Sequence, residues 1–140
     1  MCADNTNSFS LINARQINCR RRDVSTRNVT HWRNVHITFL TEPNVSTLKN
    51  LRYSGTVYCD HNFRKVRSAI FVYNKCLNCT LIPHITNGDV VSVLLENQNV
   101  ILVSVYCHND PKVNDPGTAW PEMLELAADY ARQRNFKIII

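Results

Sequence analysis

The stretch that decides the fold is DVVSVLLENQNVILVSVY, residues 89–106. Two runs rich in β-branched and aliphatic residues, 89–95 and 100–106, flank the short polar segment 96–99. Branched side chains pack well on a pleated surface, and a short polar connection favours a hairpin between two such runs. The stretch therefore predicts a β-hairpin.

Other segments with the composition of strands lie on both sides of this hairpin. They are 9–18, 35–40, 55–58, 68–73, 80–83 and 136–140. Residues 24–33 suggest a short surface helix, and 43–54 have the composition of a loop. Strands in series, followed by a helix and another strand, predict an α/β (α+β) fold.

The predicted helix near the C-terminus begins after Thr118, which serves as its N-cap, and Pro121 is tolerated in its first turn. Its apolar positions recur at helical spacing, so we expect one face to pack on the sheet. These positions are Trp120, Leu124, Ala127, Ala128 and Ala131.

The composition is that of a globular chain inside the cell. Hydrophobic residues make up 44% and charged residues 19%, which excludes a disordered chain. No apolar stretch approaches the roughly 20 residues of a membrane helix, and no secretory signal is present. We therefore expect no membrane partner, and we expect the six cysteines to be reduced, without disulfide partners.

The net charge of +5 suits a polyanionic partner such as nucleic acid, because neutralising phosphates releases counterions. A merely basic surface is an equal alternative on charge alone. The basic residues are partly grouped, in 20–22 and at Arg64, Lys65 and Arg67.

A zinc site is one candidate for chemistry. Cys59 and His61 lie upstream of Cys76 and Cys79, and this spacing resembles a four-ligand tetrahedral site. The alternative is that these cysteines are small buried hydrophobic residues, which the surrounding strand-forming residues favour.

A second candidate is a set of polar residues at the ends of apolar strands. Asn18, Glu42 and Tyr106 each follow such a strand, and Asn109 lies just beyond Tyr106. Ligands of α/β sheets bind beyond the carboxyl ends of strands, so these side chains could converge on one site. Carboxylate, amide and phenol groups suit Mg²⁺ and a phosphate. Taken singly, each also has an ordinary structural role in a turn or a packed surface.

Read in order, these segments resemble the endonuclease/exonuclease/phosphatase superfamily, whose fold is a two-sheet α/β sandwich. The likeness is greatest to the endonuclease domain of non-LTR retrotransposons. The segments that carry it are 16–18, 41–43, 66–72, 89–93, 103–109 and 137–140.

The resemblance implies roles for the four residues. Glu42 is similar to the metal-binding glutamate of the family, and Asn18 is similar to the asparagine that orients the phosphate and its ligands, so both are implied at the metal site. Tyr106 and Asn109 resemble the pair that contacts the scissile phosphate. The implied activity is Mg²⁺- or Mn²⁺-dependent hydrolysis of DNA, which nicks target sites. The implied context is nuclear, with a reverse transcriptase region downstream.

Two motifs of the family, Gly-Asp-x-Asn and Ser-Asp-His, do not occur in the 140 residues. They carry the water-activating aspartate and the histidine of the hydrolytic step. We therefore expect 9–140 to be the N-terminal portion of one such domain, truncated at its C-terminus and inactive alone. We expect residues 1–8, which precede the first predicted strand, to be a disordered tail.

Two alternatives remain at this point. One is a phosphatase of the same superfamily that acts on inositol phosphates or lipids. The other is a non-catalytic basic nucleic-acid-binding fragment, stapled by zinc at Cys76 and Cys79.

Overall fold

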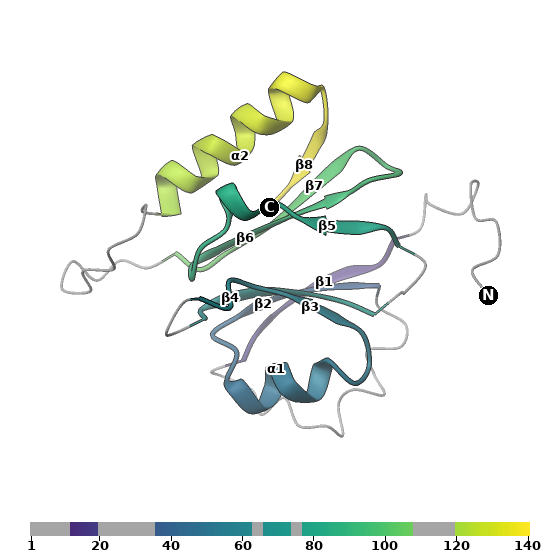
Figure 1. The fold of residues 1–140 in the computed structure, drawn as a ribbon, viewed down its shortest axis with the longest axis vertical. Helices are drawn as coiled ribbons and strands as arrows, with labels where there is room; N and C mark the ends of the chain where they lie inside the picture. Colours follow the sequence, from purple (N-terminus) through teal and green to yellow (C-terminus); the bar gives the residue numbers. More distant parts are fainter. Residues whose placement is uncertain (1–11, 20–35, 63–65, 74–76, 108–119) are drawn as a thin grey trace.

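The computed structural model describes residues 12–19, 36–62, 66–73, 77–107 and 120–140. Within these ranges two four-stranded sheets stack on one another, with α1 beyond one sheet and α2 beyond the other (Figure 1). The two-sheet α/β sandwich expected from the sequence is therefore confirmed. No helix in the described ranges is long and apolar enough to cross a membrane.

The first sheet has the strand order β1-β2-β4-β3. Strands β1 and β2 are parallel, whereas β4 is antiparallel to both β2 and β3. The end of β1 therefore lies beside the end of β2 and the start of β4, where Asn18 pairs with Thr41 and Thr41 with Ser68. The strand bounds are β1 Ala14–Asn18, β2 Ile37–Thr41, β3 Thr56–Tyr58 and β4 Ser68–Val72.

The second sheet has the order β5-β6-β7-β8, with β7 and β8 parallel and the other pairs antiparallel. The predicted hairpin is present as β6 and β7, and Val90 at the start of β6 pairs with Val105 at the end of β7. The bounds are β5 Cys79–Leu81, β6 Val90–Leu95, β7 Val100–Val105 and β8 Lys137–Ile139.

Alternating side chains of the strands fill the space between the sheets and the space beneath each helix. In β4, Ile70 and Val72 join the cluster that also holds Val91, Val93 and Leu102 of the other sheet. The intervening Ala69 and Phe71 belong instead to the cluster that includes Leu48 and Leu51 of α1. Strand β4 is buried along its whole length because both of its faces are covered.

Helix α1 (Val45–Leu51) lies where the sequence predicted a loop at 43–54, so that prediction is wrong. The helix has only seven residues, and its β-branched Val45 and Thr47 have low helix propensity. It is stabilised by its N-cap, since the Asn44 side chain accepts a 2.7 Å hydrogen bond from the Thr47 N–H. The buried Leu48 and Leu51 then attach it to the first sheet.

Helix α2 (Trp120–Arg134) covers the outer face of the second sheet, as expected. The centre of its packed face is Met123, Ala127 and Ala131, while Trp120 and Leu124 are partly buried at its margin. The short 3₁₀ helix η2 (Pro83–Ile85) packs in the same cluster through Ile85.

Most strand bounds differ by a few residues from the sequence-based expectation, and some of the predicted features lie outside the described residues. Strand β1 begins at Ala14 and β8 at Lys137, so both are shorter than predicted. The expected tail 1–8, the helix at 24–33, the cap Thr118 and the site residue Asn109 lie outside the described residues.

Candidate active site

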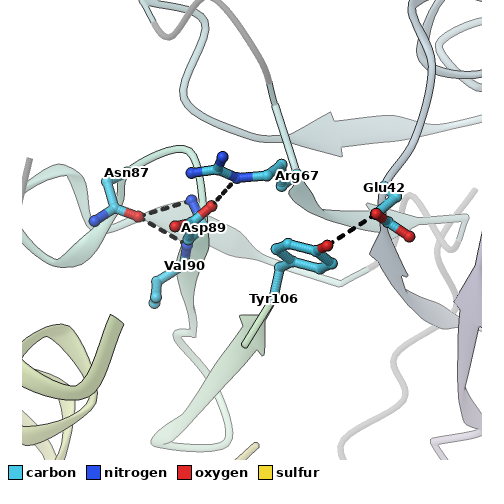
Figure 2. A network of polar contacts seen from close by, with 6 residues as sticks. All are labelled: Glu42, Arg67, Asn87, Asp89, Val90 and Tyr106. Atoms are coloured by element: carbon cyan, nitrogen blue, oxygen red, sulfur yellow. Dashed lines mark hydrogen bonds and ion pairs between the residues drawn. The ribbon is translucent and has the colours of Figure 1, made fainter. Parts of the chain in front are cut away.

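Glu42 and Tyr106 meet at one end of the sandwich. Glu42 directly follows β2 of the first sheet, and Tyr106 directly follows β7 of the second. The Tyr106 hydroxyl donates a 2.9 Å hydrogen bond to Glu42 Oε1 (Figure 2). The fold thus brings a carboxylate and a phenol from different sheets into direct contact, and both side chains are half-buried.

The backbone of Glu42 is in the left-handed region, with a φ of 52°. A residue with a Cβ adopts this conformation at a cost of about 1–2 kcal/mol, and the following Pro43 restricts the position further. The conformation is held by a 2.8 Å hydrogen bond from the Glu42 N–H to the Arg67 carbonyl oxygen. Strained backbone of this kind, held by its surroundings, is common at functional sites.

Asn18 lies at the same end of the first sheet. It is the last residue of β1 and pairs in register with Thr41, the residue before Glu42. The next residue, Cys19, donates a 2.9 Å backbone hydrogen bond to the Thr41 carbonyl oxygen, which continues the pairing beyond the strand. Three of the four residues predicted from the sequence therefore lie at one end of the sandwich, and Asn109 lies outside the described residues.

An ion pair that sequence reasoning missed lies beside this contact. The Arg67 Nε donates to Asp89 Oδ1, and the two side chains are only 9% and 14% exposed. The Arg67 guanidinium carbon is 6.0 Å from the centre of the Tyr106 ring. In the sequence Arg67 stands with the basic residues Arg64 and Lys65, whereas in the structure its side chain is buried against a carboxylate.

A sequence signal for this pair did exist. Arg67 directly precedes β4, and Asp89 directly precedes β6. Because β4 and β6 are antiparallel to β2 and β7, their starts lie beside the ends of those strands. Polar residues before strands were therefore as informative here as those after strands.

The buried thiol of Cys19 is protonated at neutral pH. Burial and, to a lesser extent, the negative charge of Glu42 together raise the pKa of Cys19 from 9.0 to about 11. A protonated thiol is a poor nucleophile and a poor metal ligand. The chemistry available at this end therefore comes from oxygen and amide groups.

These groups fit part of a Mg²⁺ or Mn²⁺ site. Magnesium is held in proteins through one or two carboxylates, with water and substrate phosphates completing its shell. The carboxylate of Glu42 and the side-chain amide oxygen of Asn18, which lies at the same end, are ligand types of this kind. In the described ranges no group of three or more His, Cys, Asp or Glu side chains could hold a metal by itself.

Of the four residues in the alternative zinc site, the described ones do not all lie together. Cys59 packs with the cluster beneath α1, whereas Cys79 packs with the cluster between the sheets. His61 lies near Cys59, with 3.7 Å between Cys59 Sγ and His61 Nδ1, and the same nitrogen is 3.2 Å from a guanidinium nitrogen of Arg52. The described part of the chain therefore does not bring Cys59, His61 and Cys79 around one ion, and Cys76 lies outside it.

Comparison with known proteins finds a solved structure that is similar to this chain. No protein-family model and no curated protein matches the chain. A solved structure, the endonuclease domain of TRAS1, a telomere-specific non-LTR retrotransposon, matches with a TM-score of 0.57 and 21% sequence identity. The match covers 85% of this chain and 52% of that one, so this chain spans about half the length of the solved domain. The chain therefore has the fold of a non-LTR retrotransposon endonuclease domain over the part that the two share.

Proposed function

We propose that this chain carries one part of the active site of a divalent-metal-dependent DNA endonuclease that nicks target sites for a non-LTR retrotransposon. The observation that supports this most directly is the contact between Glu42 and Tyr106, made across the two sheets at the end where Asn18 also lies. The shared fold with the TRAS1 endonuclease domain supports the same reaction class.

Glu42 and Asn18 would hold the metal, either Mg²⁺ or Mn²⁺. When bound, such an ion polarises a phosphoryl oxygen and stabilises the charge that develops on it during phosphodiester hydrolysis. The carboxylate of Glu42 needs a fixed direction for this role. The Tyr106 hydroxyl fixes the carboxylate by a hydrogen bond, and the hydrogen bond from the Glu42 N–H to the Arg67 carbonyl oxygen fixes the backbone that carries it.

Tyr106 has a single hydroxyl proton, and in this structure the hydroxyl donates its hydrogen bond to Glu42 Oε1. The phenol therefore orients the carboxylate. To donate to a phosphoryl oxygen of DNA instead, the hydroxyl has to rotate away from Glu42 Oε1. In the proposed site Asn109 would supply an amide donor to the same phosphate.

The proposed partner is DNA, for which the net charge of +5 provides electrostatic attraction. The proposed context is the nucleus, with a reverse transcriptase region downstream in the intact element. We propose that these 140 residues alone do not hydrolyse DNA, because the Gly-Asp-x-Asn and Ser-Asp-His motifs of the family are not among them.

The first test is metal binding by the 140-residue chain, measured from the electron paramagnetic resonance signal of free Mn²⁺. Replacing Glu42→Gln removes the charge and keeps the size, and we expect it to weaken Mn²⁺ binding about tenfold or more. The matched control is Glu125→Gln, at an exposed position of α2, which should bind as the unsubstituted chain does. Equal Mn²⁺ affinity in the Glu42→Gln variant contradicts the proposed metal site.

The second test is nicking of supercoiled plasmid in Mg²⁺. We expect no cleavage by the 140-residue chain, and robust cleavage overturns the proposal that it is inactive alone.

Fluorescence anisotropy with a DNA duplex distinguishes the proposed nuclease portion from the non-catalytic DNA-binding fragment. Salt-dependent binding that neither Mg²⁺ nor Glu42→Ala changes favours a DNA-binding fragment. Release of phosphate from inositol phosphates by a chain extended to a complete domain, without plasmid nicking, favours a phosphatase.

A further inference from the structure

Four residues form a closed ring at the end of the sandwich. The side chains of Glu42 and Tyr106 form one pair, and those of Arg67 and Asp89 form the other (Figure 2). The backbone joins the two pairs, since the Glu42 N–H donates to the Arg67 carbonyl and the Tyr106 N–H to the Asp89 carbonyl, both at 2.8 Å. A backbone hydrogen bond therefore joins Glu42 to Arg67, and another joins Tyr106 to Asp89.

The ring also spans the two sheets. In the first sheet Glu42 directly follows β2 and Arg67 directly precedes β4. In the second sheet Tyr106 directly follows β7 and Asp89 directly precedes β6. Both side-chain contacts cross from one sheet to the other. The Arg67 N–H makes a further crossing, with a 2.8 Å hydrogen bond to the Gly88 carbonyl. The ion pair therefore constrains the two backbones that carry Glu42 and Tyr106.

The ion pair is itself fixed in place. The Asn87 Oδ1 accepts hydrogen bonds from the N–H groups of Asp89 at 2.8 Å and Val90 at 2.9 Å, which orders the turn before β6 (Figure 2). The Arg67 guanidinium lies next to the Tyr106 ring, 6.0 Å from its centre. A planar guanidinium can bond a carboxylate and contact an aromatic ring at the same time, which a lysine ammonium does less well.

We infer that Arg67 and Asp89 are a positioning pair that holds the Tyr106 ring against the Glu42 carboxylate and so sets how firmly Glu42 binds a divalent cation. The second half of this statement rests on the proposed function, whereas the first half does not. Neither residue is a catalytic residue, because both act through Glu42 and Tyr106.

The experiment compares three variants of the full 140-residue chain. Asp89→Asn removes the charge at nearly constant shape. The double variant Arg67→Met with Asp89→Leu replaces the ion pair by apolar side chains, an exchange that often preserves folding. The matched control is Asp129→Asn, which breaks the exposed pair of Asp129 with Arg132 on α2. If Asp89→Asn does not fold, the double variant carries the test.

The first readout is the nuclear Overhauser cross-peak between the Tyr106 ring protons and the Glu42 side chain. We expect it to be lost in Asp89→Asn and in the double variant, while cross-peaks between β6 and β7 persist and Asp129→Asn keeps all of them. A merely structural ion pair would lower the melting temperature without removing this one cross-peak. Its persistence in the folded variants overturns the inference.

The second readout is Mn²⁺ affinity. We expect the double variant to bind Mn²⁺ about tenfold more weakly, as for other residues that orient a metal ligand. Loss of the cross-peak with unchanged Mn²⁺ affinity overturns the inferred effect on the cation. If the unsubstituted chain shows no Mn²⁺ binding that depends on Glu42, the proposed function fails. Loss of the cross-peak would then still support the positioning role.

Discussion

The N–H of Glu42 donates a 2.8 Å hydrogen bond to the carbonyl oxygen of Arg67, and this bond holds Glu42 in a left-handed backbone conformation with a φ of 52°. The two residues are 25 positions apart, but they are adjacent in space because β2 and β4 are antiparallel neighbours. The conformation turns the chain immediately after the strand, so the carboxylate lies at the end of the sheet beside Tyr106.

Glycine and alanine at position 42 should therefore differ in stability. Both Glu42→Gly and Glu42→Ala remove the carboxylate, but only glycine adopts a positive φ without steric cost. We expect Glu42→Gly to be the more stable variant by about 1 kcal/mol, measured as the free energy of unfolding in urea. An alanine variant of equal or greater stability contradicts the strain assigned to this position.

Removing the Tyr106 hydroxyl should weaken both folding and metal binding. The Tyr106→Phe variant leaves the Glu42 carboxylate without this donor, and we expect a loss of about 1–2 kcal/mol in the free energy of unfolding. Mn²⁺ affinity should fall at the same time, because the carboxylate loses its fixed direction. The control is Tyr53→Phe, at a residue that is 82% exposed, which should change neither quantity.

The ion pairs Arg67–Asp89 and Arg132–Asp129 should differ greatly in their contribution to the free energy of unfolding. We expect Asp89→Asn to cost about 3 kcal/mol, because it removes the carboxylate charge that pairs with the buried Arg67 guanidinium. The same substitution at Asp129, whose pair is 76% and 56% exposed, should cost less than about 1 kcal/mol. Urea denaturation of both variants measures the difference, and equal losses would show that the Arg67 charge is solvated.

The stability of the fold should fall in alkaline solution. Burial raises the pKa of Cys19 and of Cys79 to about 11, above the ordinary value of 9.0. The folded state therefore favours the protonated thiols, and their contribution is fully present below pH 9.0 and is lost as the pH rises through about 11.

Thermal unfolding followed between neutral pH and pH 11 tests this dependence. The melting temperature should decline over the upper part of the range. It should decline less steeply in a Cys19→Ala and Cys79→Ala double variant, which removes both thiols. Parallel curves for the two proteins would show that other groups cause the alkaline loss.

Much of the local structure follows from the order of residues. The hairpin at 90–105 and the buried strand β4 follow from runs of strand-forming residues, and the packed face of α2 follows from helical spacing. Each signal is visible within a short window of the sequence. Helix α1 was missed because it is short and contains β-branched residues. Its N-cap Asn44 was the one local signal for it.

The candidate site is only partly visible in the sequence. The position of Glu42 after β2 and of Tyr106 after β7 placed both at strand ends, since hydrophobic runs show where strands stop. Their contact spans 64 positions of the chain, and nothing local to either residue specifies it. The ion pair of Arg67 with Asp89 spans 22 positions and depends in the same way on how the two sheets stack.

The sequence by itself determined the strands, the second helix and the polar residues at strand ends, because each depends on side chains within a few positions of one another. The tertiary structure decided which of those residues meet, because the sheets pack through alternating apolar side chains whose register brings the end of β2 against the end of β7. It also decided that Arg67 is buried beside Asp89 rather than offered to a polyanion, since that depends on the carboxylate that the second sheet places opposite it.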